Sequence, residues 1–286
     1  MNFDAFQKVY ADVCRTCLRF WTPEMQTEMA RHCVSWSPEN FNFTSYFELS
    51  ALRAYYAYLA IVRHVGETGH ICDVGGFGGV FPIVLKRLGY TVTMTEALKY
   101  YSKSFDPLFD FVRQEGVEIY DYDPFEDAPT LDVAADCLTC MAVLEHYPHS
   151  PAQFIRHIKQ LVRHDGVLYF EVPNIAYWPK RYALFFKGET PLVNIAQIYA
   201  SATPFIGHHH EYTGAELKQL AAMAELTVLE ERAFNYSNQS RLSAREKFGH
   251  LRRLNLKPLL DEWIMNRYPN MRECLAVTCK NGGIHG

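Results

Sequence analysis

The sequence predicts an α/β fold built on a doubly wound, mostly parallel sheet. Three observations favour this class. An apolar strand at 70–74 runs into a glycine-rich turn and then a helix, strand-like and helix-like segments alternate along the chain, and seven segments have strand character. Parallel neighbours need a crossover connection, usually a helix, so this alternation is typical of a parallel sheet.

The first strand, turn and helix form the most informative unit. Residues 70–74 are mostly apolar and include Asp73, and residues 80–88 have helical character. The turn between them contains Gly75, Gly76, Gly78 and Gly79. Glycine lets a backbone approach a ligand closely. A second strand, 91–95, ends at Glu96, where an acid suits the hydroxyls of a ribose. The unit therefore predicts a site for a nucleotide-like molecule.

A dinucleotide fingerprint does not fit this turn. The pattern Gly-x-Gly-x-x-Gly/Ala places a pyrophosphate on the helix N-terminus. When the pattern is read from Gly75, its second glycine is Phe77, and when it is read from Gly76, its last position is Phe81. Neither frame works, so the sequence argues against a dinucleotide as the ligand.

The remaining elements continue the alternation. Further strands are expected at 116–123, from 136 into a turn that ends at 146, and at 167–174, 227–233 and 275–279. One helix is expected at 151–163, because its apolar residues recur with helical spacing, and another at 215–225. Gly166, which follows His164 and Asp165, is expected to mark the end of the first of these helices.

The order of these segments resembles that of class I S-adenosylmethionine-dependent methyltransferases, especially those that modify glycans and small molecules. The turn is similar to their Asp-x-Gly-x-Gly-x-Gly motif, with Asp73, Gly75 and Gly79 matching and Phe77 replacing the middle glycine. Three later segments also resemble the family, namely Leu144-Glu145-His146, Val172-Pro173-Asn174 and the run from Gly207 to Thr213. The resemblance covers about 69–234 and implies a Rossmann-like, seven-stranded sheet with an antiparallel last strand.

The resemblance also implies S-adenosyl-L-methionine as the cofactor, with S-adenosyl-L-homocysteine as its product. Its methionine end would lie along the glycine turn, and Glu96 would accept hydrogen bonds from both ribose hydroxyls. Asp123 would lie near the adenine edge, with Asp121 as its rival because strand ends are hard to place. The residues expected to hold the cofactor are Asp73, Gly75, Gly76, Phe77, Gly79, Glu96, Asp123 and Met141.

Three histidines are the candidate catalytic residues. Methyl transfer is an in-line displacement at a sulfonium carbon, so the protein must align the acceptor and take up any proton that it loses. Histidine is the natural base near neutral pH. His146 lies just past the fourth strand, and His208 and His210 come shortly before Tyr212. A divalent metal bound by the histidine run with Glu211 is not favoured, because adjacent residues rarely all ligate one ion, so no metal ligand is assigned.

On the resemblance alone, the expected reaction is methyl transfer to a hydroxyl of a saccharide or a sugar-derived small molecule. The alternative enzymes are a quinone or lipid-precursor methyltransferase and an N-directed small-molecule methyltransferase. An inactive, cofactor-binding partner subunit is the alternative from another class, and it stays open because Phe77 departs from the glycine motif.

We expect two parts in the chain. Residues 1–66 are expected to form an N-terminal helical cap, and 67–286 a methyltransferase domain with a lid insertion at about 175–211 and a C-terminal helical insertion at about 237–272. The aromatic and basic residues at 177–188 indicate either packing on the core or a surface for a membrane or an anionic acceptor. The basic residues of the second insertion are expected on a solvated helix face.

Composition is consistent with a globular enzyme. The 286 residues are 49% hydrophobic and 21% charged, and the net charge of −4 gives no reason to expect nucleic acid as a partner. No transmembrane segment or secretory signal is evident, and the eight cysteines, with Cys14-x-x-Cys17 and Cys137-x-x-Cys140 among them, are expected to be buried and reduced. We therefore expect a cytoplasmic protein, and we leave peripheral membrane contact and a homo-oligomer open.

Overall fold

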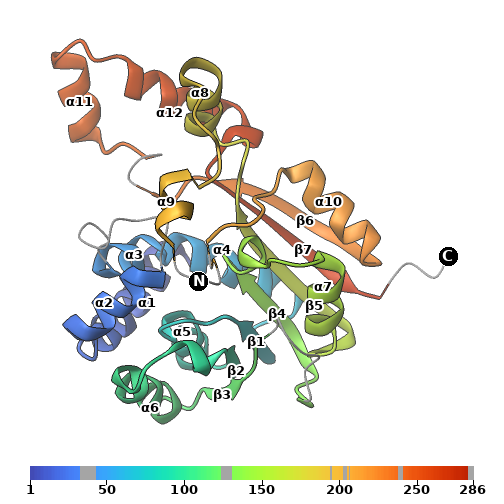
Figure 1. Cartoon of the computed structure of the whole chain (residues 1–286). Coiled ribbons are helices and arrows are strands. Elements are labelled where there is room, and N and C mark those ends of the chain that lie inside the picture. Colours follow the sequence, from blue (N-terminus) through green and yellow to red (C-terminus); the bar gives the residue numbers. More distant parts are fainter. Residues whose placement is uncertain are drawn as a thin grey trace.

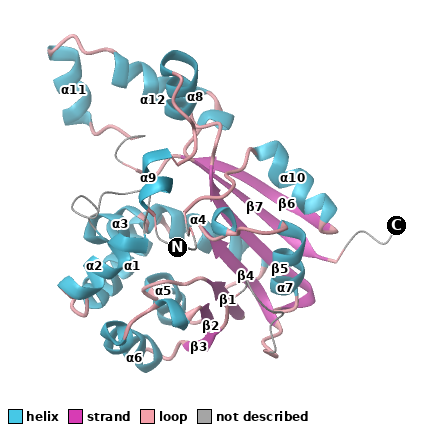
Figure 2. Cartoon of the chain, in the orientation of Figure 1, coloured by secondary structure: helices cyan, strands magenta, loops and turns pink. Residues whose placement is uncertain are grey.

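The computed structural model describes residues 1–32, 43–123, 131–193, 195–201, 205, 207–237 and 241–282. Within them lies a seven-stranded sheet in the order β3-β2-β1-β4-β5-β7-β6 (Figures 1 and 2). Its strands are β1 (His70–Val74), β2 (Thr91–Glu96), β3 (Glu118–Asp121), β4 (Ala135–Met141), β5 (Val162–Pro173), β6 (Leu226–Phe234) and β7 (Cys274–Asn281). No helix in the described ranges has the length and apolar character that crossing a bilayer requires.

Strand pairing confirms the predicted topology. β1 pairs in parallel with β2 and β4, β2 with β3, and β4 with β5. β7 runs antiparallel to both of its neighbours, β5 and β6. The strand order reverses between β1 and β4, and in such sheets ligands bind outside the carboxyl ends of the strands at this switch point.

Helices cover both faces of the sheet and bury a core on each. The core on one face includes residues of α1 (Phe3–Leu18), α2 (Pro23–His32), α3 (Phe43–Leu49), α4 (Ala51–His64), α5 (Val80–Arg87) and α6 (Asp106–Gln114). The core on the other face includes residues of α7 (Pro151–Lys159) and α10 (Gly214–Met223). The N-terminal helices thus share a core with the strands that carry the glycine turn, which fixes them beside it.

The remaining helices belong to the two insertions. α8 (Trp178–Lys187) and α9 (Ile195–Ala200) follow β5, and α11 (Ala244–Arg252) and α12 (Lys257–Arg267) lie between β6 and β7. Figure 1 shows α11 and α12 extending away from the sheet, with α8 beside α12. Positions 194, 202–204 and 206 of the expected lid, and 238–240 of the second insertion, lie outside the described residues.

The described cysteines are free and buried, as expected for reduced thiols; Cys33 lies outside the described residues. Cys137 belongs to the core on one face of the sheet and Cys140 to the core on the other. Residues three apart on a strand point to opposite faces, so these two thiols do not form a shared site.

The predicted boundary near Gly166 is wrong. α7 ends at Lys159 and β5 already begins at Val162, so Gly166 lies within the strand and does not end a helix. The ladder between β4 and β5 has an irregularity just after the Ala135–Val162 pair. A Cβ on Gly166 would lie 3.1 Å from the carbonyl oxygen of Ala135. Glycine is needed there because the two backbones approach each other closely.

Candidate functional site

The glycine turn after β1 requires glycine for steric reasons at two positions. Gly75 and Gly79 have φ values of +67° and +72°, in the left-handed region that side chains rarely adopt. A Cβ on Gly75 would lie 2.7 Å from Val143, and one on Gly79 would lie 2.4 Å from Val112. Glycine therefore lets the backbone of the turn pack closely against these two valines at the carboxyl end of β1.

Phe77, the residue that departs from the glycine motif, also has a left-handed backbone, with φ of 42°. Its N–H donates a 2.7 Å hydrogen bond to Oε2 of Glu96. Its ring lies 5.6 Å from Phe47, 5.9 Å from Phe43 and 6.1 Å from Trp21, between ring centroids. The backbone of Phe77 thus serves the turn, while its side chain packs on the N-terminal helices.

Two carboxyl groups flank the turn. Glu96, at the end of β2, also accepts a 3.0 Å hydrogen bond from the hydroxyl of Tyr101. Asp73, on β1, accepts a hydrogen bond from the hydroxyl of Thr139 on β4. Burial raises the pKa of Asp73 to about 7 and that of Glu96 to about 7. Both carboxyl groups are buried away from water, which makes their charged forms costly, as is common at functional sites.

The two rival acids after β3 have different surroundings. Asp121 is exposed and accepts a 2.9 Å hydrogen bond from the backbone N–H of Leu98. The side chain of Asp123 is only 8% exposed, and its Oδ2 lies 2.9 Å from Nζ of Lys99 and 3.0 Å from the hydroxyl of Tyr100. Asp121 thus holds a local turn, and Asp123 is the acid with side-chain partners at the sheet edge.

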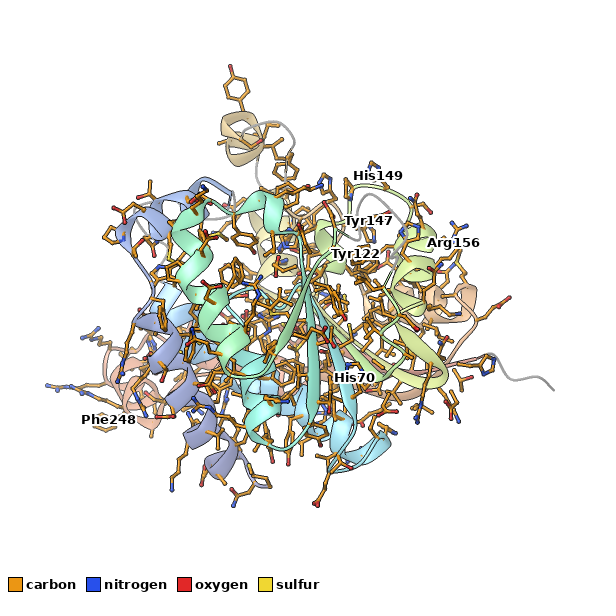
Figure 3. All side chains as sticks on the ribbon, turned by 90° about the horizontal axis from the view of Figure 1, so that it is seen from below. His70, Tyr122, Tyr147, His149, Arg156 and Phe248 are labelled. Carbon is orange, nitrogen blue, oxygen red and sulfur yellow. The ribbon has the colours of Figure 1, made fainter. Side chains whose placement is uncertain are left out.

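Aromatic and apolar residues also lie at the carboxyl ends of the strands. Figure 3 shows Tyr122, which follows β3, and Tyr147, which follows η3 (Leu144–His146), at one end of the sheet, with His70 at the other. Met141, the last residue of β4, is half-buried and packs against the core that contains the N-terminal helices. These residues lie at the carboxyl ends of the strands, where the turn and both acids also lie.

Two of the three candidate histidines meet, and an acid joins them. The rings of His146 and His208 lie 4.7 Å apart, edge to face. Glu145 offers a carboxylate oxygen, and the potential ligand atoms of these three residues all lie within 4.8 Å of one another. Glu145 is buried, its Oε2 has no hydrogen-bond partner among the described residues, and burial raises its pKa to about 7. This histidine cluster (Glu145, His146, His208) is spaced closely enough for either proton transfer or a metal ion.

A second acid orients His208. Nδ1 of His208 lies 2.8 Å from Oε1 of Glu211, and Nζ of Lys180 on α8 forms an ion pair with Oε2 of Glu211. Burial alone would raise the pKa of Glu211, but the hydrogen bond with His208 and the ion pair with Lys180 bring that pKa below its ordinary value. An ionised Glu211 fixes the proton of His208 on Nδ1 and leaves Nε2 as the basic atom.

The third candidate, His210, lies outside the cluster. Its ring contacts that of Tyr212, with centroids 4.7 Å apart, and Nε2 lies 3.6 Å from Oε1 of Glu216 in the first turn of α10. Its side chain is 54% exposed. The structure thus separates His210 from His208, although the two are close neighbours in the sequence.

Sequence reasoning missed a buried ion pair beside the cluster. Arg53 of α4 donates a 3.0 Å hydrogen bond from Nε to Oε2 of Glu171 on β5, and both side chains are buried. Oε1 of Glu171 has no hydrogen-bond partner among the described residues. The available signal was Glu171, an acid inside the apolar run 167–172. Nothing in the local sequence indicated that Arg53 would pair with it, or that Lys180 would pair with Glu211.

A separate cavity of about 560 Å³ lies between α10, β6 and β7. Its lining includes Arg181, Thr213 and Ala276 and contains no residue of the glycine turn or the histidine cluster. The polar groups with raised pKa values lie elsewhere, so we place the functional site at the turn and the cluster.

Comparison with protein families finds one that fits this geometry. The family model described as "Methyltransferase domain" matches residues 50–231, which include β1 to α10 and the whole site described above. No curated protein matches the chain.

Solved structures share the fold at low sequence identity. The 1,6-didemethyltoxoflavin N1-methyltransferase of Burkholderia thailandensis, solved with 1,6-didemethyltoxoflavin and S-adenosylhomocysteine, is 16% identical, with a TM-score of 0.50 over 80% of this chain and 78% of that chain. An S-adenosylmethionine-dependent methyltransferase of Methanosarcina mazei is 16% identical, with a TM-score of 0.51 over 78% and 97%. The [4+2]-cyclase SpnF is 16% identical, with a TM-score of 0.51 over 83% of each chain. Likeness at this identity shows a common fold, which these proteins use for different chemistry.

Proposed function

Because the chain belongs to the family of S-adenosylmethionine-dependent methyltransferases, we propose that it methylates a hydroxyl group of a saccharide or a sugar-derived small molecule. The hydrogen bond between His208 and Glu211 carries this proposal, since it provides an oriented base of the kind that a hydroxyl acceptor needs. Methylation of a neutral amine would need less help from a base.

The turn and its flanking acids fit the cofactor. When bound, S-adenosylmethionine supplies a methyl group on a positively charged sulfur that becomes a neutral leaving group. The backbone from Gly75 to Gly79 would lie along the methionine end, and the carboxylate of Glu96 would accept from the ribose hydroxyls. Asp123, held by Lys99 and Tyr100, would meet the adenine edge. Asp73 and Met141 complete the proposed cofactor residues.

His208 is the proposed base, and Glu211 positions it. Nε2 of His208 takes the hydroxyl proton as the new oxygen–carbon bond forms and the carbon–sulfur bond breaks. Glu211 stabilises the imidazolium that results, as an ionised carboxylate beside Nδ1 does in other His–acid pairs. Lys180 keeps Glu211 ionised. Only His208 changes its charge, by taking up the proton that the hydroxyl loses, while Glu211 stays ionised, so no further proton acceptor is required.

Two buried carboxylate oxygens support the proposed acceptor class. Oε2 of Glu145 and Oε1 of Glu171 are buried acceptors without a partner among the described residues, and leaving such atoms unpaired costs about 1–3 kcal/mol each. The charge of Glu171 also contributes to the raised pKa of Glu145, after the larger effect of burial. Both side chains are at most 1% exposed, so a polyhydroxylated acceptor would donate to them only after the site opens, whereas a quinone precursor has fewer donors.

We also propose that the helices outside the sheet close the site. Residues 1–66 act as the cap, because α3 and the residues after α1 contact the ring of Phe77 in the turn. The insertion at about 175–211 acts as the lid, because α8 supplies Lys180 to Glu211. Residues 67–286 then form the methyltransferase domain into which the two insertions are built.

A transfer assay tests the acceptor class. The full chain is incubated with methyl-labelled S-adenosylmethionine and, in parallel, with free or nucleotide-linked sugars, catechol-like quinone precursors and small amines. We expect label in the sugars, located on an oxygen by NMR. Label only in amines or only in quinone precursors would refute the proposed acceptor. Tight binding of S-adenosylhomocysteine without turnover on any acceptor would favour a cofactor-binding subunit.

A further inference from the structure

An exposed apolar and basic segment lies far from the proposed site. Residues 241–257, here called the arm, contain α11 and the turn into α12. Phe248 is 69% exposed and Leu254 is 83% exposed, and Leu251 and Leu256 are exposed as well. Figure 3 places Phe248 at the periphery of the molecule. Exposed apolar residues gathered on one segment usually mark an interaction surface.

The sequence of α11 puts cationic and apolar side chains on one face of the helix. Arg245, Phe248 and Arg252 recur at intervals of three and four, so they lie on the same side, and Leu251 adjoins them. Ser243 and Glu246 form a capping box that fixes the start of this helix. The mixed face is therefore a property of a well-defined helix.

Leu254 adds a second unusual feature. It adopts a left-handed backbone, with φ of 54°, at the end of α11, where glycine is the usual residue. A large side chain is strained in this conformation. Its side chain is largely uncovered, since it is the most exposed of the large apolar residues of the arm. A leucine is better suited than glycine to this position only if its side chain becomes buried against something else.

The arm is strongly basic in an acidic protein. It carries six Lys and Arg residues against one acid, Glu246, whereas the whole chain has a net charge of −4. Lys247 and Lys257 form ion pairs with Glu262 and Asp261. Within the described part of the chain, no ion pair is formed by the four arginines of the arm, Arg241, Arg245, Arg252 and Arg253.

We propose that the arm docks on an anionic lipid surface. Its apolar side chains would enter the interfacial region, and its arginines would meet the negative headgroups. Charge complementarity favours this occupant over a second copy of the chain. A two-fold pairing of arms would bring together two segments of like charge, each with six cationic residues and one acid.

The arm connects physically to the lid. Trp178 of α8 donates a 2.8 Å hydrogen bond to Asp261 of α12, and Nζ of Lys257 lies 4.3 Å from the ring centroid of Tyr182. Phe185 and Phe186 at the end of α8 are also exposed. α8 in turn carries Lys180, the partner of Glu211. Docking of the arm would therefore place the lid next to the same lipid surface.

Vesicle sedimentation of the full chain tests the proposal without any acceptor. The chain is mixed with vesicles of phosphatidylcholine alone and with vesicles that also contain phosphatidylglycerol, at low and at high salt. We expect retention only on the anionic vesicles and loss of retention in high salt, because exposed charges are screened. The proposal is overturned if the chain binds neither vesicle at low salt, or binds both equally.

Paired variants locate the surface. Arg252→Gln with Arg253→Gln is expected to weaken partitioning by at least about tenfold, since each cation near an anionic surface contributes about 1 kcal/mol. Phe248→Ser with Leu251→Ser should also weaken it. Met223→Ser, an exposed methionine on α10, and Arg113→Gln on α6 are the matched controls and should bind like the wild type.

Two results would contradict the assignment to the arm. Wild-type retention of both paired variants, with unchanged circular dichroism, would place lipid binding elsewhere. A chain that light scattering shows to be dimeric, that Phe248→Ser with Leu251→Ser makes monomeric, and that does not bind vesicles would identify a second copy as the occupant instead.

Discussion

The backbone N–H of Phe77 donates a 2.7 Å hydrogen bond to Glu96, while the ring of Phe77 stacks on Phe47 at 5.6 Å. One residue therefore connects the acid proposed to bind the ribose with the N-terminal helices. The replacement of a motif glycine by phenylalanine need not disable the turn, because a left-handed backbone is retained. It adds an aromatic contact that a glycine could not make.

Substitution of Phe77 should separate these two roles. Phe77→Ala removes a half-buried ring, so we expect the free energy of unfolding to fall by about 1–3 kcal/mol. Phe77→Gly should be more stable than Phe77→Ala by about 1 kcal/mol, because glycine adopts the positive φ at little cost. Urea denaturation measures both. Greater stability of the alanine variant would mean that the left-handed backbone is not maintained in solution.

Glu96→Gln should weaken cofactor binding. The variant keeps the shape of the side chain but removes the charge, and hydrogen bonds to charged groups contribute about 1.5–3 kcal/mol each. We expect the Kd for S-adenosylhomocysteine, measured by calorimetry, to rise at least about tenfold. Asp121→Asn is the control, because Asp121 only holds the turn at Leu98. Unchanged affinity in Glu96→Gln would reject the ribose assignment.

His208→Ala should lower turnover and leave cofactor affinity nearly unchanged. Loss of a general base typically reduces kcat by about a hundredfold to ten-thousandfold. The wild-type rate should rise with pH through one ionisation, and this rising limb should disappear in the variant. His210→Ala is the internal control, since His210 lies with Tyr212 and Glu216. The proposal that His208 is the base fails if His208→Ala retains a nearly wild-type rate.

Chelation distinguishes the base from a metal ion at the same cluster. Glu145, His146 and His208 have the spacing of metal ligands, but Glu211 already orients His208 for proton transfer. We expect an excess of EDTA to leave kcat unchanged. Loss of activity in EDTA that a divalent ion then restores would assign the cluster to metal binding.

The buried acids should make the protein less stable as the pH rises. Burial raises the pKa values of Asp73, Glu96 and Glu145 to about 7, above the ordinary values of 3.8 and 4.5. Between the ordinary and the raised pKa values, the folded state binds more protons than the unfolded state. The free energy of unfolding is therefore greatest below the ordinary values and falls as the pH rises to about 7. Chemical denaturation from about pH 5 to about pH 8 should show this fall.

Glu145→Gln isolates one contribution to the pH dependence. The variant cannot ionise at this position, so its stability should fall less steeply with pH than that of the wild type. Asp121→Asn removes an exposed acid and should keep the wild-type slope. Identical slopes for Glu145→Gln and the wild type would show that Glu145 ionises normally in the folded protein.

The sequence by itself determined the sheet and its topology, and it predicted the place of the site. Glycine spacing, apolar periodicity and acids at strand ends are local features, and they lie within the unit from β1 to Glu96. The resemblance to methyltransferases rested on such local motifs, and the family match confirmed it. Even the departure at Phe77 was visible, although the sequence could not say what its ring contacts.

Only the tertiary structure decided which polar groups meet. His208 pairs with Glu211 and contacts His146, whereas His210, two positions further along, turns to α10. Arg53 and Glu171 come together from α4 and β5. Gly166 was misread because the need for it comes from a neighbouring strand. These contacts depend on the long-range packing of helices and strands. The sequence around one residue carries no periodic pattern that identifies its partner on a distant element.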